Sequence, residues 1–228
     1  MERSIQLSSG RAVLDADLRL VDDALGLVVF AHGSGSSRKS VRNLSVARAL
    51  GAQRLSTALL DLLTADEAEV DAIDSRFRFD IPHLARRLGD ATDELLSHPA
   101  LRHLPFGYFG ASTGAAAALM AAADRPDVIG AIVSRGGRPD LASHALAMVR
   151  APTLLIVGGA DTAVLRLNQT ALDQLQHAEL AIVAGATHLF EEPGALDHVG
   201  NLAGEWLSRH LANANRRAGG APSTRRAR

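Results

Sequence analysis

Short apolar runs alternate with longer segments of helical periodicity along most of the chain. Six apolar runs have the length and composition of strands, at residues 25–33, 54–63, 106–112, 128–137, 152–160 and 179–186. Each precedes a segment with the pattern of a helix, at residues 37–52, 81–98, 113–125, 140–150, 163–176 and 195–212. Two further strands, residues 4–10 and 12–21, are predicted to form a hairpin at the start of the chain.

The predicted strands are almost continuously apolar and do not alternate between apolar and polar residues. Strands of this kind are buried on both faces, as in a parallel sheet that helices cover on each side. We therefore predict the α/β class, with a three-layer α/β/α sandwich around a mostly parallel sheet. Ligands of such sheets bind beyond the carboxyl ends of the strands. The residues that directly follow each strand are therefore the candidate functional residues.

One domain is predicted over residues 1–213, because no Pro-, Gly- or Ser-rich linker interrupts the pattern. Residues 214–228 carry Arg, Gly, Pro and Ser instead of periodic apolar residues and are predicted to be a basic, disordered tail. No lid is expected, and residues 64–80 are expected to be a charged, solvated loop. Its two aromatic residues, Phe77 and Phe79, either reach the wall of the binding pocket or only anchor the loop.

The composition changes this picture little but excludes several kinds of site. The formal net charge of −1 provides no overall field that would attract nucleic acid or an anionic membrane. The chain has no cysteine, which excludes disulfides, thiolate zinc sites and a cysteine nucleophile. Neither a signal peptide nor an apolar run of membrane-spanning length is visible. We expect a cytoplasmic protein that acts on a small molecule without a metal or cofactor, and a homo-oligomer stays an open alternative.

The sequence Gly110-Ala111-Ser112-Thr113-Gly114 falls where a predicted strand ends and a predicted helix begins. This is the setting of the G-x-S-x-G nucleophile elbow, a strained turn that exposes a serine. The residues two positions from the serine must lack a Cβ, or the strand and the helix would collide. The alternative is a turn of small residues that serves only packing.

A serine nucleophile needs a base, and the base needs a carboxylate that orients it. In a fold of this type the acid and then the histidine follow the serine along the chain. Asp161 directly follows the strand at 152–160, and His188 follows the strand at 179–186. Asp161 could instead be only a helix N-cap, and His188 a loop histidine without a role. Asp61 is a rival acid, but it precedes the serine in the chain.

Two backbone N–H groups are needed to bind the oxyanion that forms when a serine attacks a carbonyl. Thr113, at the start of a predicted helix, and Ser34, in the loop "HGSGSS", are the candidate donors. The same loop could be read as a glycine-rich phosphate cradle. However, Arg38 occupies the place of the third glycine of the dinucleotide fingerprint, and Lys39, the only lysine, completes no P-loop.

Arg135 and Arg138 lie in "SRGGRPD", at the carboxyl end of the strand that follows the nucleophile helix. Their guanidinium groups are candidates for binding a carboxylate on the substrate. Alternatively, both pair with local acids such as Asp140 or fix the backbone of the loop.

The chain resembles the α/β hydrolases, and within them the small dienelactone-hydrolase-like group. The similarity extends over nearly the whole chain and includes "VVFAHGSGSS", "GASTG", "VGGADTAV" and "GATHLFEEPGAL". It implies that Ser112, Asp161 and His188 are nucleophile, acid and base, with Ser34 and Thr113 as oxyanion donors. Typical dienelactone hydrolases have a cysteine nucleophile, so the serine leaves the choice of small ester, thioester or lactone open. A non-catalytic protein that keeps the fold for binding is the alternative.

Overall fold

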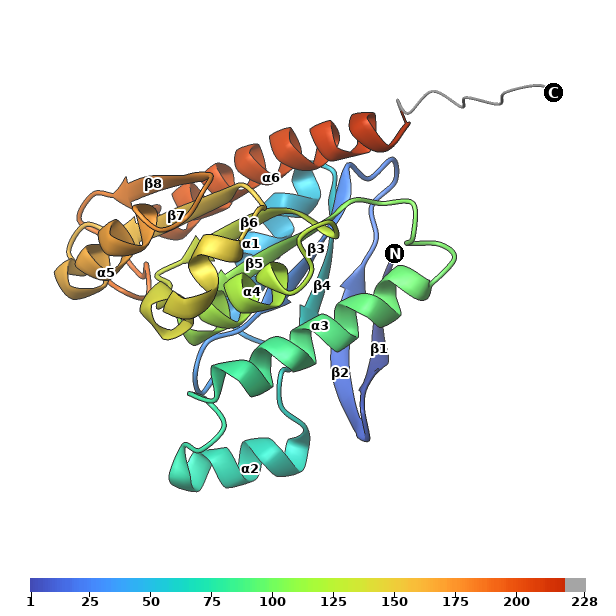
Figure 1. Cartoon of the computed structure of the whole chain (residues 1–228), viewed down its shortest axis with the longest axis horizontal. Coiled ribbons are helices and arrows are strands. Elements are labelled where there is room, and N and C mark those ends of the chain that lie inside the picture. The colour runs from blue at the N-terminus through green and yellow to red at the C-terminus, as the bar shows by residue number, and fades with distance from the viewer. Residues whose placement is uncertain (220–228) are drawn as a thin grey trace.

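One eight-stranded sheet with helices on both faces forms the body of the protein, and it confirms the predicted α/β fold (Figure 1). The computed structural model describes residues 1–219. The strands are β1 (Glu2–Ser9), β2 (Ala12–Arg19), β3 (Gly26–Ala31), β4 (Leu55–Leu60), β5 (Phe106–Ala111), β6 (Ile129–Arg135), β7 (Thr153–Gly158) and β8 (Ala178–Val183). Their order in the sheet is β1-β2-β4-β3-β5-β6-β7-β8, and only the pairings β1–β2 and β2–β4 are antiparallel.

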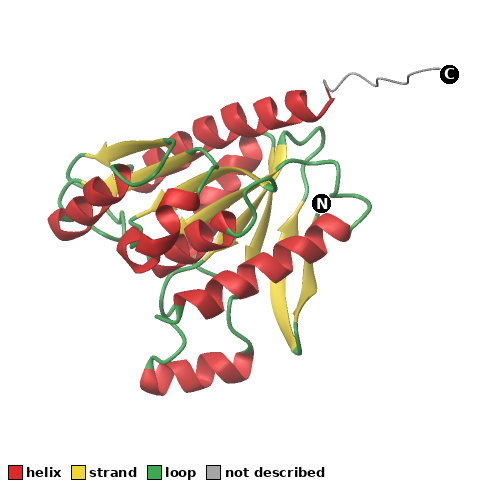
Figure 2. Ribbon diagram, viewed as in Figure 1, coloured by secondary structure: helices red, strands yellow, loops and turns green. Residues whose placement is uncertain are grey.

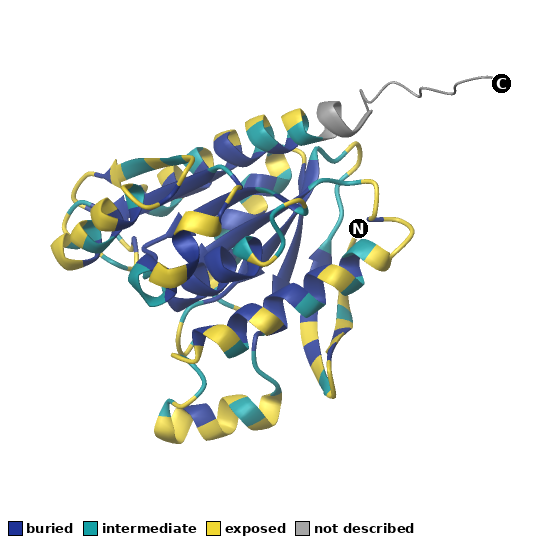
Figure 3. Ribbon diagram, in the orientation of Figure 1, coloured by how far each residue is buried: buried dark blue, intermediate teal, exposed yellow. Residues whose placement is uncertain are grey.

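Helices form the two outer layers (Figure 2). Each layer packs on its own hydrophobic cluster. One face is covered by α1 (Val41–Ala52) and α6 (Ala195–Gly219). The opposite face is covered by α3 (Ile81–Ser97), α4 (Thr113–Ala123), the 3₁₀ helix η1 (Pro139–Met148) and α5 (Thr162–Leu172). The central strands are buried from both sides (Figure 3), which accounts for their continuous apolar sequences.

Residues 64–80 do not form the predicted solvated loop, because they contain the helix α2 (Ala65–Asp74). Thr64 caps this helix: its hydroxyl accepts a hydrogen bond from the N–H of Glu67, and the Glu67 carboxylate accepts one from the N–H of Thr64. This capping box was visible in the sequence as T-x-x-E, but the many charges favoured a loop. Figure 1 shows α2 standing apart from the sheet on two connecting segments.

Several predicted boundaries also change: the helix predicted over 37–52 begins at Val41, and the one predicted over 163–176 ends at Leu172. The segment predicted as a helix over 140–150 is η1, which starts at Pro139 and is interrupted by a non-helical Ala142. Helix α6 reaches Gly219, so the predicted disordered tail is helical over residues 214–219, and its remainder, 220–228, lies outside the described residues. In the part of the chain that the structure describes, no helix is both long and apolar enough to cross a membrane.

Candidate active site

Ser112 occupies a sharp turn between β5 and α4. Its backbone has φ of 50° and ψ of −120°, a strained conformation for a residue with a side chain. A Cβ at Gly114 would collide with the carbonyl oxygens of Ala31 and His32, and a Cβ at Gly110 would collide with Ala115. The two glycines are therefore required by close backbone contacts on either side of the serine. This is the geometry that the G-x-S-x-G motif predicts.

Asp161 and His188 are joined by a hydrogen bond of 2.7 Å from imidazole Nδ1 to carboxylate Oδ2. Because a carboxylate accepts this bond, the proton of the neutral ring lies on Nδ1 and the lone pair is on Nε2. The other carboxylate oxygen, Oδ1, accepts a hydrogen bond from the N–H of Val164 and caps α5. Asp161 thus acts both as a helix N-cap and as the partner of the histidine.

The end of β6 brings the serine and the histidine to the same edge of the sheet. The N–H of Ser112 donates to the carbonyl oxygen of Arg135, and a Cβ on the next residue, Gly136, would lie 3.5 Å from His188 Nδ1. Among the described residues, the Ser112 hydroxyl forms no hydrogen bond, so the candidate nucleophile and the candidate base are not in contact in this structure. Hydrogen bonds of this kind are often long in ligand-free enzymes and shorten when substrate binds.

Glu192 holds the loop that carries His188, and the sequence analysis missed it. Its Oε1 accepts hydrogen bonds from the N–H and the hydroxyl of Thr187, at 3.0 and 2.6 Å. These bonds hold the pKa of the Glu192 carboxyl below its usual value. The turn also requires φ of 57° at Phe190, whose side chain is buried. Because the hydrogen bonds between Glu192 and Thr187 depend on this turn, no residue pattern in the sequence indicates them.

The two candidate oxyanion donors lie beside the serine. The hydroxyls of Ser34 and Thr113 are 2.9 Å apart, and a Cβ at Gly33 would lie 3.1 Å from the Cβ of Ser112. Within the described part of the chain, the backbone N–H groups of Ser34 and Thr113 donate to no acceptor. Both are therefore available to an anion that forms at Ser112.

A second residue that the sequence analysis missed, His32, fixes the loop of Ser34. Its Nδ1 donates to the carbonyl oxygen of Gly33, and its Nε2 accepts from the N–H of Leu62. Burial lowers the pKa of His32, although the Gly33 carbonyl and the charge of Asp61 act in the opposite direction. The neutral ring ties the end of β3 to the end of β4. A histidine directly before a glycine at the end of a buried strand was the signal in the sequence.

A cavity of about 200 Å³ opens beside Ser34 and Thr113, the candidate oxyanion donors. Its apolar lining includes Leu62, Leu63, Ala68 and Leu84, and its polar wall comes from α2 and the segment after it. There, Arg78 Nε donates to Asp71 Oδ2 at 2.8 Å, and Arg78 Nη2 donates to the backbone oxygen of Asp71. Burial raises the pKa of the Asp71 carboxyl, but the hydrogen bonds from Arg78 and Phe77 lower it more, so this pair is ionised.

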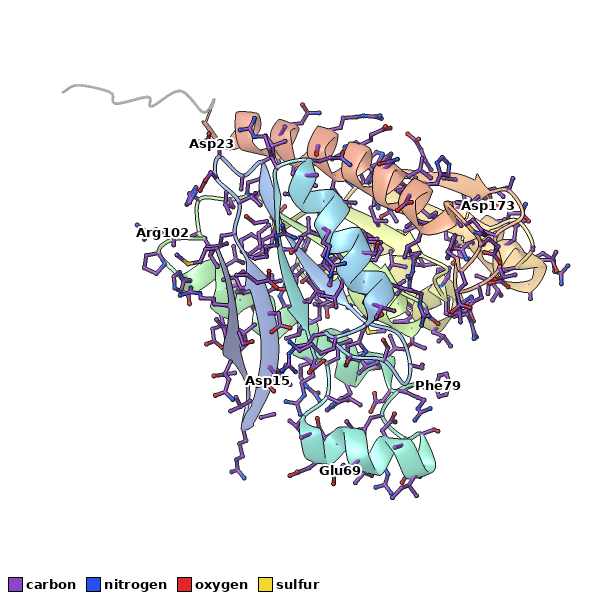
Figure 4. The ribbon with its side chains drawn as sticks, turned by 180° about the vertical axis from the view of Figure 1, so that it is seen from behind. Asp15, Asp23, Glu69, Phe79, Arg102 and Asp173 are labelled. Carbon is purple, nitrogen blue, oxygen red and sulfur yellow. The ribbon has the colours of Figure 1, made fainter. Side chains whose placement is uncertain are left out.

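The two phenylalanines near α2 do not line this cavity. The ring of Phe77 packs on His83, with 5.6 Å between ring centroids. Phe77 therefore anchors the segment and does not reach the wall of the cavity, which is the second of the two alternatives considered for it. Phe79 lies on the segment after α2 and is 56% exposed (Figure 4). Arg78, which stands between them in the sequence, is the residue that reaches the cavity.

The two candidate arginines are also absent from the cavity lining. Arg138 forms a two-pronged ion pair with Asp140, at 2.9 and 2.8 Å, which is the structural alternative considered for it. Arg135 is buried, and the residue is only 7% exposed. The rival acid Asp61 binds the backbone N–H and the guanidinium of Arg38, so it does not orient His188.

No family model matches the sequence. The solved structure of a dienelactone hydrolase from Anabaena variabilis is 53% identical to this chain, with a TM-score of 0.91, and the match covers 92% of this chain and 98% of that one. The chain belongs to the dienelactone-hydrolase-like α/β hydrolases. This α/β hydrolase also shares its fold with Est1E from Butyrivibrio proteoclasticus, at 14% identity and a TM-score of 0.78 over 92% of this chain and 99% of Est1E.

Two curated proteins from strains of Mycobacterium tuberculosis are also similar to this α/β hydrolase, and both are provisionally named phosphoribosyl transferases. Each is 50% identical over 211 residues, which make up 92% of this chain and 47% of the relative. The chain therefore spans about half the length of these relatives.

Proposed function

We propose that this α/β hydrolase cleaves a small ester, thioester or lactone through an acyl-enzyme on Ser112. The observation that carries the proposal is the 2.7 Å hydrogen bond between Asp161 and His188, at the sheet edge where the elbow holds Ser112. A relative of 53% identity that is named a dienelactone hydrolase supports the same class of chemistry.

In the proposed reaction, His188 Nε2 takes the proton of the Ser112 hydroxyl as Oγ attacks the carbonyl carbon. Asp161 stabilises the imidazolium that forms. The N–H groups of Thr113 and Ser34 bind the tetrahedral oxyanion. Collapse of the tetrahedral intermediate breaks the bond to the alcohol or thiol, which takes the proton from His188. This group then leaves, except in a lactone, where it stays attached as the hydroxyl end of the acyl chain. A water molecule, deprotonated by His188, then attacks the acyl-enzyme. Collapse of this second tetrahedral intermediate breaks the bond to Ser112 Oγ, which takes back the proton from His188 as the carboxylic acid is released.

The size of the cavity favours a short acyl group. Pockets for drug-sized ligands have volumes of about 300–1,000 Å³, whereas the cavity beside Ser34 and Thr113 has about 200 Å³ and a largely aliphatic floor. In kinetics with p-nitrophenyl esters, we expect kcat/KM for the acetate and butyrate to exceed that for the laurate at least about tenfold. Ala68→Met, which adds bulk to the cavity lining, should lower kcat/KM for the butyrate more than for the acetate. Equal kcat/KM for all chain lengths would contradict the assignment of this cavity to the acyl group.

Two other functions receive less support. The name phosphoribosyl transferase belongs to proteins about twice as long, of which this chain matches 47%. The loop that could cradle a phosphate packs against Ser112 through Gly33, and Arg38 and Lys39 in and beside it are held by acidic side chains. A non-catalytic binding protein is the second candidate, and inactivity of the pure protein toward all activated esters would favour it.

A further inference from the structure

Arg135 is a buried cation without an acceptor. The residue is 7% exposed, and in the described part of the chain its enclosed Nε and Nη1 atoms have no hydrogen-bond partner. Burial and the nearby charge of Arg42 lower the pKa of Arg135 to about 10, which still leaves the group charged at neutral pH. Buried charges in proteins are normally paired, because an unpaired charge is costly to remove from water. Among the described residues, no carboxylate pairs with Arg135 to compensate this cost.

The side chain of Arg135 belongs to the face of the sheet that α1 and α6 cover. Side chains alternate between the two faces of a strand, and Ala131 and Val133 pack in the cluster on the α1 and α6 face. Ser134 projects to the other face, where its hydroxyl adjoins Gly137. Arg135 thus lies behind the loop of His188, away from the cavity beside the oxyanion donors.

Arg42, in the first turn of α1, adds a second cation to this place. Its Nη1 pairs with Glu191 at 3.1 Å, but Glu191 is a surface group with 65% of its side chain exposed. The enclosed Nε of Arg42 has no partner within the described residues. The first turn of α1 contains no acidic residue, and a helix N-terminus itself favours an anion. The unsatisfied donors here belong to two guanidinium groups with positive charge, and the enclosed oxygens Asn43 Oδ1 and Glu192 Oε2 also have no partner within the described residues.

We propose that Arg135 and Arg42 form a binding site for a small oxyanion, a phosphate or a carboxylate, on the α1 and α6 face behind the loop of His188. Guanidinium groups bind both kinds of anion through paired N–H donors. The bound oxyanion accepts the hydrogen bonds that Nε and Nη1 of Arg135 lack in this structure. The site is separate from the proposed esterase cavity, and its occupancy can be measured without turnover.

The test is titration of the whole chain with sodium phosphate, and separately with sodium acetate, against sodium chloride at equal ionic strength. Calorimetry should give saturable binding of at least one of these oxyanions. A concentration one hundred times Kd should raise the Tm by about 5–10 °C. Arg135→Gln should weaken binding at least about tenfold, whereas Arg150→Gln, which removes one exposed charge next to Asp127, should leave it unchanged.

Arg42→Gln serves as a second variant if Arg135→Gln does not fold, and it should also weaken binding. Without oxyanion, Arg135→Met should be at least as stable as the unmodified protein, because it removes an unpaired buried charge. Equal Tm in phosphate, acetate and chloride, or equal binding by the Arg135 and Arg150 variants, would overturn the proposal.

Discussion

Replacement of Ser112 by alanine should lower kcat for activated short esters by about 10⁴–10⁶-fold. The variant removes the atom that would form the acyl bond and leaves the elbow glycines in place. Alanine has the same Cβ as serine, so the strained backbone at φ of 50° should persist and the fold should be retained. Steady-state kinetics with p-nitrophenyl acetate, together with the thermal unfolding curve, would measure both effects.

Ser97→Ala is a matched control for this substitution. Ser97 lies at the end of α3, and its hydroxyl donates only to the backbone oxygen of Glu94. Its loss should change kcat by less than about twofold, because surface substitutions usually have small effects. Wild-type turnover by purified Ser112→Ala would contradict the role of Ser112 as nucleophile.

Replacement of Asp161 by asparagine should lower kcat by about 10⁴-fold. An amide in place of the carboxylate can donate to His188 Nδ1, which would favour the tautomer with the proton on Nε2 and so block the base. The cap of α5 provides an internal control, because asparagine is as good an N-cap as aspartate. The variant should therefore unfold at nearly the same temperature as the unmodified protein, and the loss of rate should not come from instability.

Asp61→Asn is the matched comparison, since Asp61 is the other acid that follows a strand of the sheet. It contacts Arg38, so this variant should change stability more than kcat. Kinetics of both variants on the same ester would separate the two acids. A larger loss of kcat for Asp61→Asn than for Asp161→Asn would show that the wrong carboxylate had been assigned to His188.

The sequence predicts most of the fold because its local and long-range signals agree. The continuous apolar strands reflect burial on both faces, and Gly110 and Gly114 mark a turn where a Cβ has no space. The order of Ser112, Asp161 and His188 along the chain was sufficient to identify the acid that contacts the histidine. These features depend on residue type and spacing, which the sequence contains.

Features that depend on the exact conformation of a turn or on the register between neighbouring strands were harder to predict. The hydrogen bonds of Glu192 to Thr187 require the turn at Phe190. The side chain of Arg135 points to the α1 and α6 face because of the register of β6, in which Arg135 pairs with Ala111 and Ile156. A shift of one residue would have turned it to the other face. The sequence places this arginine at the end of a strand but cannot select the face.

Labelling by a fluorophosphonate probe tests the account of the active site most directly, because the probe reacts only with an activated serine. We predict one label per chain, found by mass spectrometry on the peptide that contains Ser112, no label on Ser112→Ala, and much slower labelling of Asp161→Asn. Failure of the folded, unmodified protein to react, or equal labelling of Ser112→Ala, would contradict the assignment of Ser112 as an activated nucleophile.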